Sequence, residues 1–355
     1  MSIEINDFGK TVDGRDIHLY TITNSNGVVL NLTDLGACWV GILVPDKDGK
    51  LDDVCLGLLS GSEYETGSYD AFGAIVGRSA NRIWQARFNL NGREYRLVDN
   101  DLGKNLHSGP DFYYTRLWNG NAVDTESGEG VEFSLHSPDG DQCMPGNIDI
   151  TVTYILTEDN SVIIEYRGLS DADTLFNMTN HAYFNLGGHK SGTIDDEKVW
   201  IDADYFTYGM DGSTSDGNLY TVVNTPADFR QLKRLGDELH CDERTIVEKG
   251  GYDHNFVLKN NGELELVAKC VDEKSGRYMD IFTDMPGLMM YTGNYINTKN
   301  KGKDGAVYHP FCGVAFETQY WPDAINHENF PSPVIKAGEE KISQTIYHFG
   351  VLGDE

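Results

Sequence analysis

The sequence lacks long apolar runs and the short motifs that identify many metal- and nucleotide-binding proteins. No uninterrupted run of about 18 apolar residues occurs, so we expect no membrane-spanning helix. No G-x-G-x-x-G follows an expected strand, and G-x-x-x-x-G-K-[ST], H-E-x-x-H and G-x-S-x-G are all missing. Nucleotide-binding, metallopeptidase and α/β-hydrolase functions are therefore disfavoured from the start.

Basic residues are scarce as well. The 355 residues include 28 Lys and Arg against 56 Asp and Glu, which gives a formal net charge of −28. Nucleic acids and anionic membranes are bound through clustered Lys and Arg, so neither is expected as a partner. The six cysteines form no C-x-x-C pair and are expected to be buried free thiols. The N-terminal stretch lacks the pattern of a signal peptide, which leads us to expect a cytoplasmic protein.

Short alternating segments indicate an all-β fold. Residues 87–98 predict a hairpin around Asn91-Gly92, because both central residues of a type I′ turn need positive φ. Residues 263–272 and 277–283 predict two further strands joined by a turn. Only residues 225–232, with Pro226 at a helix-start position, predict a turn or two of helix. Strands spaced by roughly 8–12 residues favour a large antiparallel sandwich or barrel, and no linker divides residues 1–355, so one domain is expected.

Polar side chains interrupt several apolar segments. His181 lies among amides and aromatic rings in Asn177–Gly188, a pattern that suits either a polar, sugar-sized ligand or a hydrogen-bonded core histidine. Comparable polar groups occur in four other segments: Gly77-Arg-Ser-Ala-Asn-Arg82, Asn105-Leu-His-Ser-Gly109, Gly251-Tyr-Asp-His-Asn-Phe256 and Phe311-Cys-Gly-Val-Ala-Phe-Glu-Thr-Gln319. Together they indicate acid–base chemistry on a polyhydroxylated substrate.

Glu317 is the strongest candidate for a base. It follows six mostly apolar residues, and burial of an unpaired carboxylate raises its pKa towards the range that a general base near neutral pH requires. The alternative is a structural salt bridge from Glu317 to Arg78 or Arg82. For Asp253, the alternative is a turn stabilised by side-chain hydrogen bonds, and for Arg78 it is packing of its long stem.

These motifs, in this order, resemble those of the aldose 1-epimerases, or galactose mutarotases. The resemblance runs from about Phe8 to Phe349, and it includes Thr179-Asn-His-Ala-Tyr-Phe-Asn-Leu186, Pro286-Gly-Leu-Met-Met-Tyr-Thr-Gly-Asn294 and Glu317-Thr-Gln319 in addition to the segments above. It implies a galactose mutarotase-like β-supersandwich that interconverts the α and β anomers of free hexoses such as D-galactose and D-glucose. It also implies that neither a cofactor nor a metal is needed.

The same resemblance implies a role for each candidate residue. Glu317 would be the base that takes the proton of the C1 hydroxyl, and His181 would be the acid that protonates the ring oxygen. The residues that would bind the sugar are Arg78, Asn81, His107, Asp253 and Met290. The partner would be a small sugar, and the protein would be a monomer or a homodimer.

Three departures from the family pattern affect the expected pocket. Met290 replaces an aromatic residue, which puts the sugar preference in question; Ser108 replaces a glycine after the second histidine; and Phe112 replaces a glycine in the following loop. Three alternative functions remain: an epimerase of hexose 6-phosphates, a non-catalytic sugar-binding module, and a glycoside hydrolase whose two carboxylates are Glu317 and Asp253.

Overall fold

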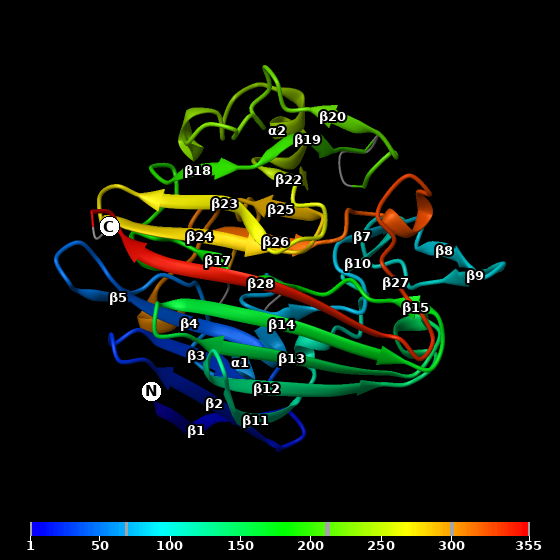
Figure 1. The fold of residues 1–355 in the computed structure, drawn as a ribbon, viewed down its shortest axis with the longest axis horizontal. Coiled ribbons are helices and arrows are strands. Elements are labelled where there is room, and N and C mark those ends of the chain that lie inside the picture. The colour runs from blue at the N-terminus through cyan, green and yellow to red at the C-terminus, as the bar shows by residue number, and fades with distance from the viewer. Residues whose placement is uncertain (1, 68–69, 210–213, 299–301, 354–355) are drawn as a thin grey trace.

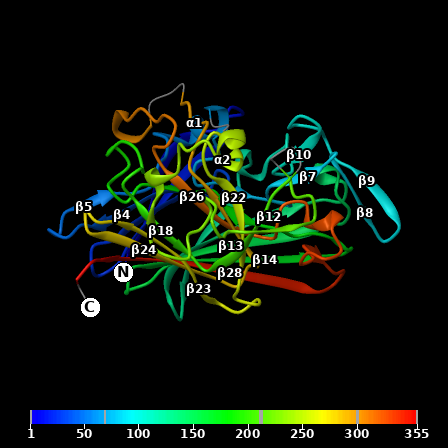
Figure 2. The same ribbon diagram turned by 90° about the horizontal axis from the view of Figure 1, so that it is seen from above.

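Three antiparallel sheets form most of the molecule. The computed structural model describes residues 2–67, 70–209, 214–298 and 302–353. The largest sheet of that described part runs across the middle of Figure 1, with the sheet of the first five strands at the lower left, and Figure 2 shows that β22 and β26 of a third sheet lie behind its upper strands. Both chain termini lie on the same side of the molecule (Figures 1 and 2).

The described strands are grouped as follows. The five-stranded sheet contains, in spatial order, β1 (Ser2–Lys10), β2 (Asp16–Thr23), β3 (Val29–Thr33), β4 (Cys38–Pro45) and β5 (Leu51–Asp53). The nine-stranded sheet contains, in spatial order, β11 (Asn119–Thr125), β12 (Gly128–Ser137), β13 (Ile148–Leu156), β14 (Ser161–Ser170), β28 (Glu340–Val351), β24 (Arg277–Thr283), β23 (Glu265–Asp272), β18 (Lys198–Ile201) and β21 (Lys233–Arg234). The six-stranded sheet contains, in spatial order, β17 (Tyr183–Phe184), β26 (Val314–Gln319), β25 (Gly287–Tyr291), β22 (Asp253–Leu258), β19 (Ala203–Thr207) and β20 (Leu219–Thr221).

Short pairs and single turns complete the described structure. The two-stranded pairs are β10 (Lys104–Leu106) with β7 (Arg82–Trp84), β16 (Thr179–Asn180) with β6 (Ile75–Val76), β15 (Thr174–Leu175) with β27 (Val334–Ile335), and β8 (Arg87–Leu90) with β9 (Arg93–Arg96). The α-helices are α1 (Gly61–Gly67) and α2 (Arg244–Lys249), and the 3₁₀ turns are Tyr113–Thr115, Asp141–Cys143, Leu235–Asp237, Lys303–Gly305 and Ala324–Asn326. None of the described helices has the length and apolarity to cross a membrane.

Trp39 marks the point where the three large sheets meet. Its ring, on β4, makes edge contacts with Tyr154 of the nine-stranded sheet and Phe184 of the six-stranded sheet, at centroid distances of 6.4 and 5.3 Å. Tyr347 and Phe349 of β28 complete the cluster. Edge-to-face packing of buried aromatic rings is favourable beyond the area it buries, so this cluster ties the sheets into one core.

The expected all-β architecture is confirmed. The hairpin at residues 87–98 forms β8 and β9, and Asn91 and Gly92 both have positive φ, at 51° and 76°. The strands at 263–272 and 277–283 are β23 and β24. Each cysteine is a free thiol, four of them buried, although Cys143 is exposed and Cys241 half-buried.

The expected helix at residues 225–232 is absent, since this described segment consists of turns. The Thr225 hydroxyl donates to the Val222 carbonyl and accepts from the Ala227 N–H. Local side-chain bonds of this kind compete with helical hydrogen bonds. The two α-helices of the described residues lie elsewhere, at segments for which the sequence patterns did not predict a helix.

Candidate active site

Glu317 is positioned by the alternation of β26. Phe316 points into the main apolar core, so the side chain of Glu317 points to the opposite face of the strand. That side chain is only 3% exposed, and its Oε2 atom has no hydrogen-bond partner. A buried, partly unsatisfied carboxylate is costly for stability, which is typical of a functional group.

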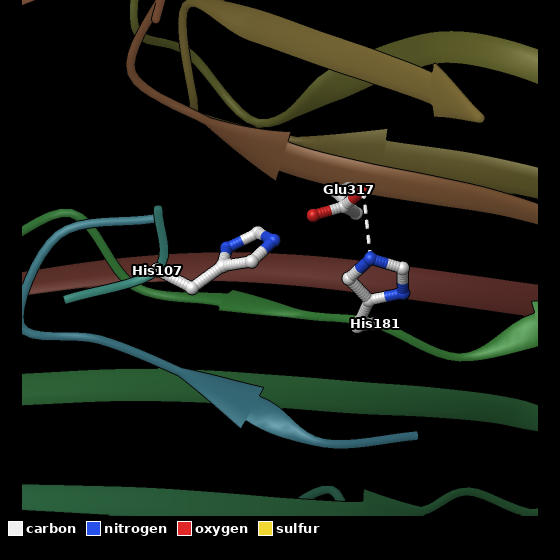
Figure 3. A group of neighbouring side chains, drawn as sticks. All are labelled: His107, His181 and Glu317. Carbon is white, nitrogen blue, oxygen red and sulfur yellow. Dashed lines mark ion pairs between the residues drawn. The ribbon is translucent and has the colours of Figure 1, made fainter. Parts of the chain in front are cut away.

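His181 faces Glu317 because two short strands bring it there. Its N–H donates to the Ala74 carbonyl at 2.9 Å, and its carbonyl accepts from the Gly73 N–H at 3.0 Å. Beyond it, β17 pairs with β26, with Tyr183 opposite Ala315. This register puts His181 across from Glu317, and its Nε2 lies 3.4 Å from Glu317 Oε1 (Figure 3). The sequence-predicted pair is therefore brought together.

His107 lies on the other side of the carboxylate, immediately after β10 (Figure 3). Its ring centroid is 5.7 Å from that of His181. Ligand atoms of His107, His181 and Glu317 all lie within 4.8 Å of one another, which makes them the one described group whose spacing would suit a metal ion. Asn81 contacts His107 through the main chain, and its side-chain oxygen accepts from the Arg82 N–H at 2.8 Å.

Asp253, at the start of β22, is surrounded by cations. Its carboxylate lies 3.5 Å from Lys249 Nζ and 4.0 Å from Arg82 Nη1. Burial acts to raise the pKa of Asp253, but Lys249 and Arg82 outweigh burial and hold that pKa below its ordinary value. Asp253 is therefore an ionised acceptor. Arg82 also pairs with Asp101 at 2.7 Å, and both partners hold its guanidinium in place.

Arg82, rather than Arg78, is the arginine of the site, and the expectation for Arg78 is corrected. The fully buried guanidinium of Arg78 donates to the carbonyls of Pro145 and Gly146, at 2.9 and 3.1 Å, and to the Ser137 hydroxyl. These bonds engage it in a structural network of its own. Sequence reasoning considered Arg82 only as an ion partner of Glu317, although it stands in the same motif.

The expectation for Met290 is corrected for a related reason. Met290 pairs with Phe316, and both side chains are in the main apolar core. Met289 pairs with Glu317 and lies on the same face of the sheet as that carboxylate. It also borders a small cavity of about 20 Å³ together with Asp253 and Asn255. The methionine at the candidate site is therefore Met289, one residue earlier than expected.

The other two departures are accommodated locally. Ser108 has a positive φ of 59°, the conformation that favours glycine. Its hydroxyl accepts from the Ser79 N–H and donates to the Ser79 carbonyl, which ties the loop of His107 to the loop of Asn81. Phe112 stacks on Tyr114 at 4.5 Å, so it packs against a neighbouring ring.

Two further polar side chains near Glu317 stand in the motifs that the sequence analysis singled out, but they were assigned no role there. Asn255 is the cross-strand neighbour of Met289, and its Oδ1 has no hydrogen-bond partner. Gln319 lies two residues beyond Glu317 on the same face of β26, and neither atom of its buried amide has a partner. Alternation from Glu317 was the sequence signal for Gln319, whereas the position of Asn255 beside Met289 depends on strand pairing, which the sequence does not show.

Burial controls the protonation of the acid–base pair. Removal from water raises the pKa of Glu317 to about 8, with the charge of Asp253 adding to this effect and that of Arg82 opposing it. Burial lowers the pKa of His181 to about 4. Between these values the pair carries one proton in total. It therefore presents one proton donor and one acceptor at the same time, which is what concerted acid–base chemistry requires.

The fold and the site define a class of protein, namely a large β-sandwich with a buried histidine–glutamate pair among groups that can bind hydroxyls. The family model of aldose 1-epimerase matches residues 18–348. The chain belongs to the aldose 1-epimerase family.

Individual relatives match over nearly the whole chain. Galactose mutarotase from Sus scrofa is 37% identical over 327 residues, 92% of each chain. Aldose 1-epimerase from Escherichia coli K12 is 36% identical over 344 residues, 95% of this chain and 96% of the relative. The crystal structure of galactose 1-epimerase from Lactobacillus acidophilus superposes with a TM-score of 0.86 at 25% identity, covering 99% of both chains. That of an aldose epimerase homologue from Caenorhabditis elegans also gives 0.86, at 29% identity, covering 94% of this chain and 99% of the other.

Proposed function

We propose that this protein is an aldose 1-epimerase that interconverts the α and β anomers of free hexoses such as D-galactose and D-glucose. The observation that carries the proposal is the buried His181–Glu317 pair at 3.4 Å, which holds one proton near neutral pH. Family membership supports it. The substrate is a small sugar, and the chain's own acid and base supply the chemistry.

The reaction needs one proton taken and one given. In its ionised form, Glu317 accepts the proton of the C1 hydroxyl while the imidazolium of His181 gives its proton to the ring oxygen. The C1–O5 bond breaks, its electron pair goes to O5, and C1 becomes the free aldehyde. After rotation about C1–C2, the two proton transfers reverse and the ring closes as the other anomer.

The surrounding groups favour the charged form of the pair when a sugar is bound. Burial favours neutral Glu317 and neutral His181, whereas the hydroxyls of a bound sugar would solvate the carboxylate and Arg82 attracts it. Arg82, Asp253, Asn255 and His107 are the groups we assign to sugar hydroxyls, and holding the sugar against the pair lowers the entropic barrier. Positioned proton transfer typically contributes about 10²- to 10⁴-fold.

Two other enzymatic functions need to be distinguished from epimerisation. A glycoside hydrolase uses one protonated and one ionised carboxyl group, and the pKa shifts of Glu317 and Asp253 have those directions. The group that faces Glu317 at 3.4 Å, however, is the imidazole of His181, which supplies the acid that an epimerase needs. An epimerase of sugar phosphates would need cations free to bind phosphate, whereas Arg82 and Lys249 both contact the Asp253 carboxylate. A non-catalytic binding module would not require the acid–base pair.

Polarimetry on freshly dissolved α-D-galactose and α-D-glucose tests the proposal. We expect the wild-type protein to accelerate the decay of optical rotation and Glu317→Gln to abolish most of the acceleration. Glu197→Gln is the matched control, because Glu197 is also buried with its pKa raised to about 8 but contacts Leu186 and Cys270. Full activity of Glu317→Gln would refute the role of Glu317. Hexose 6-phosphates and an aryl glycoside, assayed in parallel, would reveal the alternatives.

We further propose that residues 1–355 form one domain of a cytoplasmic protein that is a monomer or a homodimer. One cluster of buried residues extends from Tyr20 to Phe349, which supports a single unit. The free thiols are typical of a reducing compartment. Light scattering on the purified protein measures its oligomeric state, and fractionation of cells locates it.

A further inference from the structure

The loops that carry Asn81 and His107 are joined by two reciprocal hydrogen bonds. The His107 N–H donates to the Asn81 carbonyl at 3.0 Å, and the Asn81 N–H donates to His107 Nδ1 at 3.2 Å. Both residues have positive φ, 59° for Asn81 and 54° for His107. This backbone conformation turns the Asn81 N–H towards the imidazole.

A main-chain N–H can only donate, so its bond determines which nitrogen of the imidazole carries the proton. His107 Nδ1 must accept, and the proton of the neutral ring is then on Nε2. A second proton on the ring would place two N–H groups against each other. The charged and titratable groups that face this ring are His181, Glu317 and Arg82. Burial lowers the pKa of His107 well below its ordinary value, and the charges of His181 and Arg82 act in the same direction.

We infer that His107 is a fixed hydrogen-bond donor to the sugar, held as the neutral Nε2–H form by the main-chain N–H of Asn81. Asn81 is thus a positioning residue that acts through its backbone. The inference builds on the proposed function, because it assigns a role at the same site. It leaves Glu317 and His181 as the pair that exchanges protons with the sugar.

The same bond decides whether the three clustered side chains suit a metal ion. A nitrogen that carries a proton has no lone pair available for a metal, so His107 cannot ligate through the Nε2 that faces the cluster. Two groups remain, His181 and Glu317, and structural or catalytic zinc sites use at least three protein ligands. The ligand chemistry of the cluster therefore does not suit a zinc ion, although its spacing would.

Nitrogen NMR of the full-length protein labelled with ¹⁵N-histidine tests this inference directly. We expect His107 to show one protonated Nε2 and one unprotonated, accepting Nδ1, unchanged between pH 5.5 and 8.5, with the signals assigned by their loss in His107→Asn. Protonated Nδ1 in the neutral ring, or titration within that range, would overturn the inference. The measurement does not depend on turnover, so a protein inactive in polarimetry would refute the proposed function and leave this result readable.

Two further measurements separate backbone from side-chain effects. Asn81→Gly retains the main-chain N–H and accommodates positive φ, so we expect the His107 nitrogen pattern to persist; its loss would show that the Asn81 side chain is required. In calorimetric titration with Zn²⁺ alone, we expect the wild type and His107→Asn to give the same result, because His107 contributes no ligand. A site of micromolar or tighter affinity lost in that variant would contradict the fixed donor.

Discussion

The buried carboxyl group of Glu317 should lower the stability of the protein at alkaline pH, and its neutral isostere should restore it. An unfolded chain ionises this group near its ordinary pKa of 4.5, whereas the folded protein does so only at about 8. The folded state binds the proton more tightly, so the free energy of unfolding falls as pH rises through this interval. The interval corresponds to about 5 kcal/mol, at about 1.4 kcal/mol per pH unit.

Glu317→Gln removes this dependence, because the amide stays neutral and can occupy the same space. We expect the variant to match the wild type near pH 4.5 and to exceed it by up to about 5 kcal/mol at pH 9. Urea unfolding followed by tryptophan fluorescence at a series of pH values measures the difference. The variant should simultaneously lose about 10²- to 10⁴-fold in epimerase activity, which would make Glu317 a case in which function costs stability.

Glu197→Gln separates the two effects. Glu197 is buried, and burial raises its pKa to about 8 as well, so its substitution should also stabilise the protein at pH 9. The hydrogen-bond partners of Glu197 are Leu186 and Cys270, so the Glu197→Gln variant should keep the epimerase activity of the wild type. Equal stability of wild type and Glu317→Gln at pH 9 would refute the reasoning that burial controls this carboxyl group.

Three further predictions address the proton shared by His181 and Glu317 and the two residues, Arg78 and Met290, whose expected positions were corrected. The pH profile of kcat/KM should be bell-shaped. Activity should fall below about pH 4, where the His181–Glu317 pair binds a second proton, and above about pH 8, where the pair loses its remaining proton. A profile with a single limb would exclude a shared proton. Arg82→Lys should raise KM for the sugar. Arg78→Lys should lower the free energy of unfolding by about 3 kcal/mol or more, because one ammonium group cannot replace the bonds of the guanidinium to Pro145, Gly146 and Ser137. The opposite result in kinetics and urea unfolding would restore Arg78 to the site. Met290→Ala should destabilise the protein by about 2–5 kcal/mol, and Met289→Ala should instead change the ratio of galactose to glucose turnover, which parallel polarimetry measures.

Local chemistry made several features of this protein predictable from its sequence. The hairpin at Asn91-Gly92 formed as expected because its two turn residues tolerate positive φ whatever their surroundings. The all-β architecture followed from alternation and turn spacing along the whole chain. Glu317 and His181 were identifiable because burying a titratable side chain usually costs stability, so its presence in an apolar segment indicates a function. The ordered motifs then placed both residues in a family.

Tertiary structure decided which neighbour in each motif faces the site. Arg78 and Arg82 stand four residues apart in one motif, and only packing against Pro145 and Gly146 directs Arg78 away. Met289 lies on the face of Glu317 and Met290 in the apolar core, and a register shift of one residue would reverse the two faces. That register is determined by the pairing of β25 with β26. His181 and Glu317 meet through the pairing of β17 with β26. Strand pairing joins residues far apart in the chain, so the face that each side chain occupies is determined by partners that local sequence does not specify.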